Sequence, residues 1–507
     1  MRLIVLLLTG TAALGIGLAS HAAPAGNPGR SAATGLCRRA PPLPPLAAEA
    51  ERGQAQGGYG RPTPRYESAT AADGIAPPPP PVPEAAPPAP PAIAAPPPIV
   101  APAPAARTRD GIAVTGSLPR GPSAAPGSAF TPRRTDPARP PAGLLTAGEH
   151  DDLLNPELYA SYVDAFVKGE PLAGVPRVDT ARVLTVSVRD GAGRPLPFAP
   201  VTLTCADGNR LTLATLADGN VAFFPDLDRL GREVTIGVPG ADGPRRATLA
   251  GGAGGVTERI VVARPPAPVR ALDLALVVDC TGSMGDELSY LQSELRAILT
   301  ELRARHPDLD LHVALIAYRD RGDDYVTRTF PLTGDVGAIQ AGLGRQRADG
   351  GGDEPESMEV AMARAAGLAW RAGAVHSLFL VADAPPHADD VAATWAAAER
   401  LRASRVQIVP VAASGVARGA EYIMRAMAAA TQSRYLFLTD DSGIGNPHAP
   451  PAIDCYQVTR LADAMRRVLD GQLSGRRVEP DRDEIIRTVG TYDAGRCVLP
   501  SGWDRWQ

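Results

Sequence analysis

The sequence predicts an α/β protein whose main domain is a doubly wound, mostly parallel sheet. Its C-terminal half alternates short apolar runs with helix-forming stretches, which is typical of a sheet covered by helices on both faces. A preceding region, 178–264, contains short segments of strand-like alternation separated by turn residues, which indicates a small β-sandwich. Residues 23–142 are mostly Ala, Pro, Gly, Ser and Arg, and this composition buries too little apolar surface to fold.

The N-terminus has the pattern of an export signal over residues 1–22. Arg2 supplies a positive charge, Leu3 to Leu18 form an apolar run, and Ser20-His21-Ala22 resembles a cleavage site. The apolar run is short for a membrane span of about 20 residues. We therefore expect an exported protein, periplasmic, on the cell surface or extracellular, with no integral membrane span after signal cleavage.

Residues 23–142 are interpreted as a disordered Ala/Pro-rich spacer. The stretch Pro77 to Pro104 favours a polyproline II helix, and about 28 residues at about 3.1 Å each would reach roughly 90 Å. A passive tail explains the composition equally well, and a ligand for proline-binding domains is a third interpretation.

Residues 143–177 are expected to form a short helical docking segment, because Asn155-Pro156-Glu157 precedes a helix-like stretch from Leu158 to Val167. Region 178–264 resembles the immunoglobulin-like or transthyretin-like modules of secreted bacterial proteins. Its expected strands are 183–188, 201–204, 211–213, 221–224, 234–236, 246–248 and 260–262.

Pro265 to Pro268 mark a linker to the main domain, which we place at 270–475, with a C-terminal extension at 476–507. Its strands are expected at 274–278, 311–317, 377–382, 406–411 and 435–438, and its helices at 287–303, 357–372, 391–403, 421–430 and 458–469.

Net charge argues against one class of partner, and the cysteine content argues against a disulfide framework and a zinc site. The 51 basic and 55 acidic residues give a net charge of −4, which offers no attraction for nucleic acid. The five cysteines are too few and too scattered for a disulfide framework or a zinc site, and at least one must be unpaired. Cys455 and Cys497 are the best candidates for a bridge, and Cys280 is expected to pack as a small apolar residue.

Acidic and hydroxyl side chains stand where the predicted strands end. Asp279 closes the first strand, Asp320 follows the second and Asp383 follows the third, while a Gly-rich loop carries Glu356 into a helix. Open sheets of this type bind ligands at the carboxyl ends of their strands. Because Mg²⁺ prefers six oxygen ligands, these residues predict a metal site.

The motif Asp279-x-Thr281-x-Ser283 resembles the Asp-x-Ser/Thr-x-Ser signature of von Willebrand factor type A domains. The resemblance covers about residues 270–472 and implies a secreted bacterial protein with a metal-ion-dependent adhesion site. It implies that Asp279, Thr281 and Ser283 hold Mg²⁺ or Mn²⁺, with Asp383 as a direct or water-mediated ligand.

The second loop departs from that pattern, since the usual threonine is missing. Asp353-x-Pro355-Glu356 is instead similar to the integrin β-subunit I-like domain, which implies that Glu356 ligates the central metal. The same resemblance puts Asp320 and Asp353 beside one flanking cation, and Asp286 with Glu287 beside another, with Ca²⁺ at these positions. A helix cap at Asp353 and first-turn carboxylates at Asp286 and Glu287 explain the same residues.

The resulting functional prediction is an exported, metal-dependent protein-binding or adhesion module. By the resemblance, its partner is a protein or glycoprotein that presents a carboxylate to the cation. A structural cell-envelope protein and a non-catalytic scaffold subunit are the alternatives.

An enzyme is not expected. Position 281 is Thr where a Gly-x-Ser-x-Gly elbow requires Gly, and no residue is nominated as a general base. His387 is interpreted as a loop-packing residue, with a position beside the metal ligands, close to Asp383 in the sequence, as the alternative.

Overall fold

The structure is a computed structural model that describes residues 35–38, 43, 145–169, 172, 174–249, 254–352, 354–413, 415–442 and 448–499. The predicted signal peptide, nearly all of the predicted spacer and Asp353 lie outside the described residues. No helix within the described ranges is long and apolar enough to cross a membrane.

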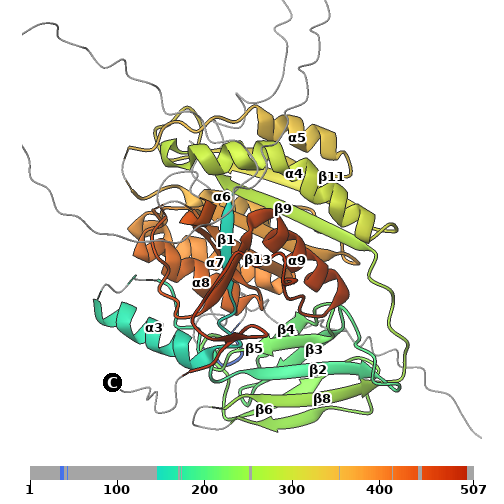
Figure 1. The fold of residues 1–507 in the computed structure, drawn as a ribbon. Helices are drawn as coiled ribbons and strands as arrows, with labels where there is room; N and C mark the ends of the chain where they lie inside the picture. The colour runs from blue at the N-terminus through green and yellow to red at the C-terminus, as the bar shows by residue number, and fades with distance from the viewer. Residues whose placement is uncertain are drawn as a thin grey trace, which may run out of the picture. The chain divides into compact units, whose positions relative to one another are not determined.

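A nine-stranded sheet forms the centre of the larger domain, in the order β11-β10-β9-β12-β13-β14-β1-β15-β16 (Figure 1). The strands β10, β9, β12, β13 and β14 pair in parallel, while β11, β1 and β16 run in the opposite direction. This confirms a mixed α/β fold with a large, mostly parallel sheet. The strands are β1 (Thr146–His150), β9 (Ala271–Asp279), β10 (Asp310–Tyr318), β11 (Thr327–Thr333), β12 (Val375–Ala382), β13 (Val406–Ala412), β14 (Tyr435–Thr439), β15 (Tyr456–Arg460) and β16 (Arg487–Val489).

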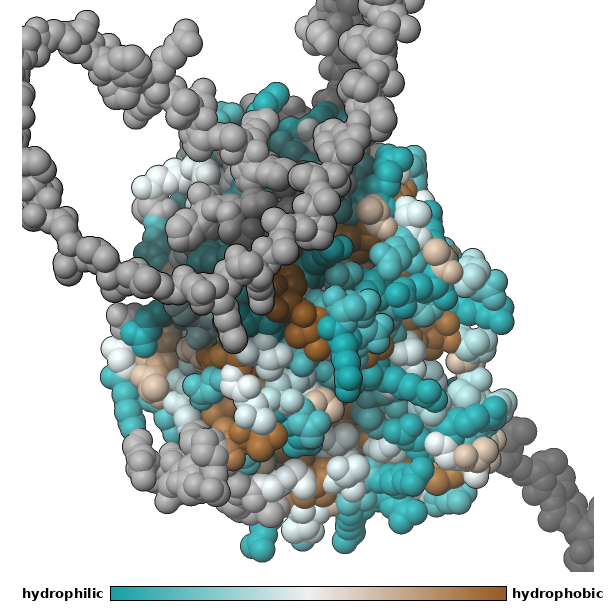
Figure 2. All heavy atoms as spheres, viewed as in Figure 1, coloured by the Kyte–Doolittle hydropathy of each residue, from teal (hydrophilic) through white to brown (hydrophobic). Residues whose placement is uncertain are grey.

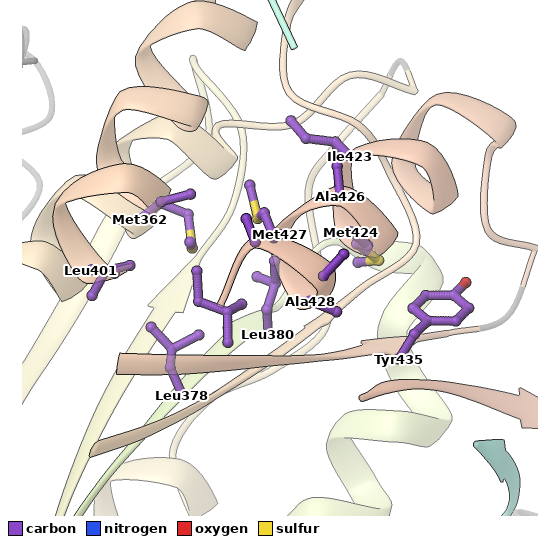
Figure 3. Packing of buried hydrophobic residues seen from close by; sticks show 14 of the residues in the cluster. Met362, Leu378, Leu380, Leu401, Ile423, Met424, Ala426, Met427, Ala428 and Tyr435 are labelled. Carbon is purple, nitrogen blue, oxygen red and sulfur yellow. The ribbon is translucent and has the colours of Figure 1, made fainter. Parts of the chain in front are cut away.

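Helices cover both faces of this sheet, which explains why its central strands are apolar at nearly every position. One face packs against α6, α7 and α8, with α3 packed on α8 through the stacked rings of Phe166 and Tyr422, and the other face packs against α4, α5 and α9. Figure 3 shows Met362 of α6, Leu401 of α7 and Met427 of α8 packed over Leu378 and Leu380 of β12. The helices are α3 (Pro156–Gly169), α4 (Gly285–Arg305), α5 (Val336–Gly344), α6 (Met358–Ala366), α7 (Val391–Ala403), α8 (Arg418–Ala430) and α9 (Leu461–Ser474).

Two predicted helices have different bounds in the structure. Helix α6 ends at Ala366 rather than at 372, because Gly367 caps it and the Trp370 indole N–H turns back to donate to the Ala365 carbonyl. Helix α9 begins at Leu461 rather than at 458, because the preceding residues form β15, which pairs with β1 and β16.

Strand β1 corrects the prediction for residues 143–177. The helix α3 is present, but Thr146–His150 is a strand inserted between β14 and β15 and not part of a helical docking segment. Its Glu149 is 1% exposed and lies 3.2 Å from the Arg434 guanidinium, with Arg467 at 3.7 Å and Arg477 at 3.6 Å. Burial acts to raise the pKa of Glu149, but these three cations lower it below its ordinary value. The main domain is therefore incomplete without this segment.

We predict that a fragment spanning 268–475 does not fold cooperatively. It lacks β1, so β14 and β15 lose their shared neighbour, and the guanidinium groups of Arg434 and Arg467 lose the Glu149 carboxylate. A fragment spanning 143–499 is the matched control and should show a single thermal transition by circular dichroism. Equal cooperativity of the two fragments would contradict this assignment.

The smaller domain contains the seven strands at the positions expected from the sequence. They form a three-stranded sheet, β5-β2-β8, and a four-stranded sheet, β4-β3-β6-β7, which share one apolar core. The immunoglobulin-like or transthyretin-like assignment of this domain stays a prediction. The strands are β2 (Leu184–Asp190), β3 (Pro200–Thr204), β4 (Arg210–Ala214), β5 (Asn220–Phe223), β6 (Glu233–Gly237), β7 (Arg245–Thr248) and β8 (Val256–Val262).

The described residues of the predicted spacer are attached to the folded part of the chain. Cys37 forms a disulfide with Cys205, its amide donates to the Arg229 carbonyl, and Leu43 packs against the core. The chain is attached again at Leu145, which is buried. The described residues on either side of the Pro-rich segment, Leu43 and Leu145, therefore both contact the folded part of the chain.

Cysteine pairing follows the sequence prediction in part. Cys455 and Cys497 form a disulfide, as expected, and Cys280 is a buried free cysteine. Sequence reasoning did not find the bridge from Cys37 to Cys205, because these residues are 168 positions apart.

Cleavage of the chain between the two anchors should leave the N-terminal piece attached. With a specific protease site inserted between Ala71 and Ala72, the piece that carries Cys37 should stay bound through its disulfide and leave only after reduction. Non-reducing and reducing gels measure this directly. The Cys205→Ser variant is the control that should release the piece without reductant, and release from the parent chain without reductant would refute the bridge.

Candidate metal centre

The end of β9 supplies the first part of the candidate site. Asp279 is fully buried, and its Oδ1 accepts hydrogen bonds from the Thr281 amide at 3.0 Å and the Thr281 hydroxyl at 2.8 Å. A short 3₁₀ turn at Gly282–Met284 then leads into α4, with Ser283 in its middle. The Gly282 amide donates to the Gly350 carbonyl, which joins this loop to the Gly-rich one.

The loop that leads into α6 and the loop after β12 supply the second part. The Glu356 amide donates to the Pro385 carbonyl at 2.9 Å, and Glu356 forms an isolated β-bridge with Pro386. This contact brings the side chain of Glu356 to the same end of the sheet as Asp383. Both residues are buried, at 4% and 8% exposure.

A pocket of about 370 Å³ lies where these loops meet. Its lining includes four predicted ligands, Thr281, Ser283, Glu356 and Asp383, together with a wall of glycines at 350–352. Gly351 has a positive φ of 76°, and a Cβ there would lie 3.0 Å from the Glu356 Oε1 atom. A larger residue would therefore be strained and crowded at this position, so the wall requires glycine.

The carboxylates of the site repel one another and are poorly solvated. Burial and the neighbouring Asp383 raise the pKa of Asp279 to about 7. Burial, together with the charges of Asp279 and Asp320, raises the pKa of Glu356 to about 9. Burial also raises the pKa of Asp383, and the charge of Glu354 adds to this effect. These shifts are those of buried carboxylates without a nearby compensating cation.

Three buried oxygens of these residues have no hydrogen-bond partner among the described residues. They are Oδ2 of Asp279, Oε2 of Glu356 and Oδ1 of Asp383. Buried polar atoms are nearly always paired, and carboxylate and hydroxyl oxygens are the ligands that Mg²⁺ and Ca²⁺ prefer. The residues present therefore fit a divalent cation.

Acidic side chains alone do not form a metal cage. In the described ranges, no group of three or more His, Cys, Asp or Glu residues is arranged to hold a metal ion. A cation in this pocket would therefore depend on the hydroxyls of Thr281 and Ser283 and on water in addition to the carboxylates.

The residues predicted to lie beside flanking cations are found in different environments. Asp320 is buried, and its Oδ1 accepts from the Ser357 hydroxyl at 3.1 Å and lies 2.6 Å from the His387 Nε2 atom. Asp323 accepts hydrogen bonds from the amides of Asp320 and Gly351. His387 thus contacts a candidate ligand, but that ligand is Asp320 and not Asp383, its neighbour in the sequence.

Asp286 and Glu287 lie in the first turn of α4 and do not line the pocket. Their position agrees with carboxylates that interact with the helix dipole. The charge of Asp286 still contributes to the raised pKa of Asp383, so the two acidic groups are near each other.

Comparisons with known proteins agree with this fold. Residues 273–445 match the family model described as von Willebrand factor A domain. This segment is a von Willebrand factor A-like domain. It contains Asp279, Glu356 and Asp383, so the whole candidate pocket lies within the matched residues.

Two curated proteins are similar over short stretches. Alpha-protein kinase vwkA of Dictyostelium discoideum is 30% identical over 118 residues, which are 23% of this chain and 19% of that protein. A putative ariadne-like RING finger protein of Acanthamoeba polyphaga mimivirus is 33% identical over 116 residues, which are 23% of this chain and 11% of that protein. The chain thus spans less than a fifth of either relative.

Among solved structures, the chain is similar to the pilus adhesin SpaC from Lactobacillus rhamnosus GG. In the open conformation the identity is 15% and the TM-score 0.28, with 48% of this chain and 31% of that chain covered. A second structure of that adhesin gives 14% identity and a TM-score of 0.29, with 48% and 32% covered. A similarity at these TM-scores does not bear on function.

When a chelator keeps the protein free of divalent cations, its free energy of unfolding should fall as pH rises. The folded, cation-free protein has raised pKa values at Asp279, of about 7, and at Glu356, of about 9. It therefore binds more protons than the unfolded chain between about pH 4 and about pH 9. Denaturant titrations across this range measure the slope.

Replacing Glu356 with a residue that does not titrate should make the free energy of unfolding depend less steeply on pH. At about pH 8, Glu356→Gln should raise the stability of the cation-free protein by about 1–3 kcal/mol, because a carboxyl with a pKa of about 9 must take up a proton on folding and the neutral amide need not. The control Glu354→Gln changes an exposed carboxylate of the same loop and should shift stability by less than about 0.5 kcal/mol. An unchanged slope in Glu356→Gln would show that this side chain does not carry the predicted charge repulsion.

Proposed function

We propose that the chain is an exported, metal-dependent protein-binding or adhesion module. The observation that supports this most directly is the pocket in which buried, unpartnered oxygens of Glu356 and Asp383 stand beside the hydroxyls of Thr281 and Ser283. Asp279 does not line this pocket, but its Oδ1 accepts hydrogen bonds from Thr281, and its Oδ2 is also buried without a partner. The Asp-x-Thr-x-Ser motif resembles a metal-ion-dependent adhesion site, and the Glu356 loop is similar to that of integrin β I-like domains. A secreted bacterial protein is part of the same proposal.

In this proposal, Asp279, Thr281, Ser283, Glu356 and Asp383 hold Mg²⁺ or Mn²⁺. When bound, the cation supplies attraction for an oxygen donor of a partner protein or glycoprotein. The protein's own residues set the geometry of the site. Thr281 fixes one oxygen of Asp279, and the bridge from Glu356 to Pro386 holds two loops at a constant separation.

Flanking cations such as Ca²⁺ remain part of the proposal, beside Asp320 and Asp353 and beside Asp286 and Glu287. We include them because of the net charge of the central site. Three ligating carboxylates give one divalent cation a formal charge of −1, which weakens its attraction for a partner carboxylate. A second cation nearby would offset this charge.

A non-enzymatic role is proposed, in which the carboxylates of the pocket act as cation ligands rather than as general bases. The described residues that line it include no histidine, lysine or cysteine. His387 lies against Asp320 rather than in the pocket lining. Recognition of a partner requires only the cation and a shaped surface, which this arrangement can supply.

Cation binding to the whole chain tests this function. After treatment with chelator, calorimetric titration with Mg²⁺, Mn²⁺ and Ca²⁺ should show saturable binding that weakens at least tenfold in Ser283→Ala, because a ligand oxygen is lost. The control Ser293→Ala removes a hydroxyl from α4 outside the pocket and should bind as the parent does. Absence of binding at millimolar cation would refute the proposal.

A structural role for the cation is the second candidate, and the complete burial of Asp279 favours it. The two roles differ in what Ser283→Ala changes. If the cation serves recognition, partner capture is lost while the melting temperature with metal stays close to that of the parent. If the cation only stabilises the fold, the melting temperature falls and capture by the remaining folded protein persists.

A further inference from the structure

A second pocket lies between the smaller and the larger domain, at the end of the sheet opposite the candidate metal centre. Its volume is about 430 Å³, which is in the size range of pockets that bind small organic molecules. The smaller domain contributes Leu213 and Ala214 of β4, and the larger domain contributes the connections that follow α6 and α7. His376 near the start of β12 lines this pocket, whereas Asp383 of the metal centre follows the end of that strand. At about 3.3 Å per residue, the two sites are roughly 20 Å apart.

Contacts between and within the domains hold the walls of this pocket in place. Arg402 at the end of α7 pairs with Asp228 of the smaller domain through N–O distances of 2.7 and 2.9 Å, and the two side chains are 9% and 4% exposed. In the larger domain, one ring nitrogen of His376 lies 2.7 Å from the Arg371 carbonyl oxygen and the other 2.7 Å from that of Ser404. His376 thereby joins the two connections that line the pocket, so the pocket is preformed.

Arg405 brings a positive charge into the lining of this pocket. Its guanidinium donates to the carbonyls of Ala374 at 3.2 Å and Ala372 at 2.6 Å, and lies 4.2 Å from the centre of the Phe198 ring. The two carbonyls accept two of the five N–H groups that an arginine carries, which leaves donors for a further group. Among the residues that the structure describes, no Asp or Glu forms an ion pair with Arg405.

Two neighbouring arginines differ from Arg405 because each is balanced by a carboxylate. Arg371 pairs with Asp273 at 2.6 Å, and Arg402 pairs with Asp228. Burial lowers the pKa of Arg405 to about 10, and the charge of Asp273 opposes this effect only in part. Since Asp273 is itself held by Arg371, the positive charge of Arg405 is left for a group from outside the chain.

The backbone of Arg405 is also strained. Its φ is +63°, in the left-handed region, just after α7, where glycine is the usual residue. Phe198, on which its guanidinium stacks, likewise has a positive φ, of 58°. Left-handed backbone is unfavourable for residues with a Cβ atom, and such strain occurs preferentially at functional sites. Glycine would relieve the strain at position 405, so the side chain is what this position contributes.

An aromatic and aliphatic wall stands beside this cation. Trp370 lines the pocket, and its indole N–H is fixed by a hydrogen bond of 3.0 Å to the Ala365 carbonyl. Leu368 and Leu213 line the same pocket from the larger and the smaller domain. Apolar walls with a few fixed polar groups are typical of small-molecule sites, and an aromatic side chain offers a flat face to a ring.

Exposed apolar residues elsewhere do not form a comparable site. The large hydrophobic residues that are exposed in the described ranges are Val167, Val261, Ile486 and Val498, and none lines this pocket. On the face drawn in Figure 2, hydrophobic residues form separate small groups among hydrophilic ones. The pocket between the domains instead combines an apolar wall with an unbalanced cation.

We propose that this pocket binds a small organic carboxylate that carries an apolar or aromatic ring. The carboxylate pairs with the guanidinium of Arg405, whose planar arrangement of donors matches two carboxylate oxygens. The ring packs against Trp370 and Leu368. This site does not rest on the proposed metal-dependent function, because the candidate cation ligands lie at the other end of β12.

The test is a calorimetric titration of the full chain with 3-phenylpropionate in the presence of a chelator. Two matched probes separate the contacts, since 3-phenylpropanamide lacks the charge and propionate lacks the ring. We expect saturable binding of 3-phenylpropionate, and affinities at least about tenfold weaker for each of the other two probes, because each loses one of the two contacts.

Arg405→Gly should weaken the binding of 3-phenylpropionate by at least about tenfold, to the level of its amide. Glycine accepts the positive φ at this position, so the variant is expected to fold, and thermal melting checks this. Arg229→Gly is the matched control. Arg229 also has a positive φ, of 51°, but does not line the pocket, so this variant should bind as the parent does.

Equal affinity for 3-phenylpropionate and its amide would overturn the proposal, as would unchanged binding in folded Arg405→Gly. No saturable binding of 3-phenylpropionate up to about 20 mM would also overturn it. If Arg405→Gly does not fold, the comparison of the acid with its amide on the parent chain decides the question by itself. Because the titrations are made in chelator, failure here leaves the proposed metal-dependent function untouched.

Discussion

The uncompensated burial of three carboxylates is the constraint on which the functional end of the sheet depends. Asp279 comes from the end of β9, and Glu356 and Asp383 come from two loops; each has a buried oxygen without a hydrogen-bond partner. A protein that gains stability from burial loses part of it when such groups are left unpaired. Their convergence at the carboxyl ends of parallel strands is the usual position of a binding site in this type of fold.

At β1, a buried carboxylate is neutralised by arginines, which is the opposite of the arrangement at the pocket. Glu149 of β1 is as buried as the pocket carboxylates, but it is surrounded by Arg434, Arg467 and Arg477, and its pKa is lowered instead of raised. The contrast shows that this chain can neutralise a buried carboxylate with arginines where it is structural. The described lining of the pocket contains no arginine, so its buried carboxylates lack the kind of partner that Glu149 has.

The sequence alone predicted the parts of the fold that depend on local pattern. The five apolar central strands and the seven strands of the smaller domain were found because their hydrophobic periodicity is strong. Strand β1 was not found, since Thr146 to His150 has no alternating apolar pattern and its pairing with β14 joins residues almost 300 positions apart. Strand pairing of that kind is a tertiary property.

The sequence also predicted only part of the candidate site. The spacing of Asp279, Thr281 and Ser283 is local, so their grouping was evident before the structure. Glu356 and Asp383 do join Thr281 and Ser283 at one pocket, and Asp279 is hydrogen-bonded to Thr281. The contact of His387 with Asp320 and the role of Asp323 in the Gly-rich loop were not evident. They depend on loop conformations that no spacing rule describes, and Asp353 lies outside the described residues.

Anomalous diffraction from crystals of the full chain soaked in Mn²⁺ would test the central claim most directly. The account predicts one strong peak in the pocket, with the Ser283 hydroxyl and carboxylate oxygens of Glu356 or Asp383 within coordination distance. A pocket without a peak, in crystals that show Mn²⁺ at other positions, would contradict it. In that case the buried carboxylates would have to be protonated groups that serve the fold alone.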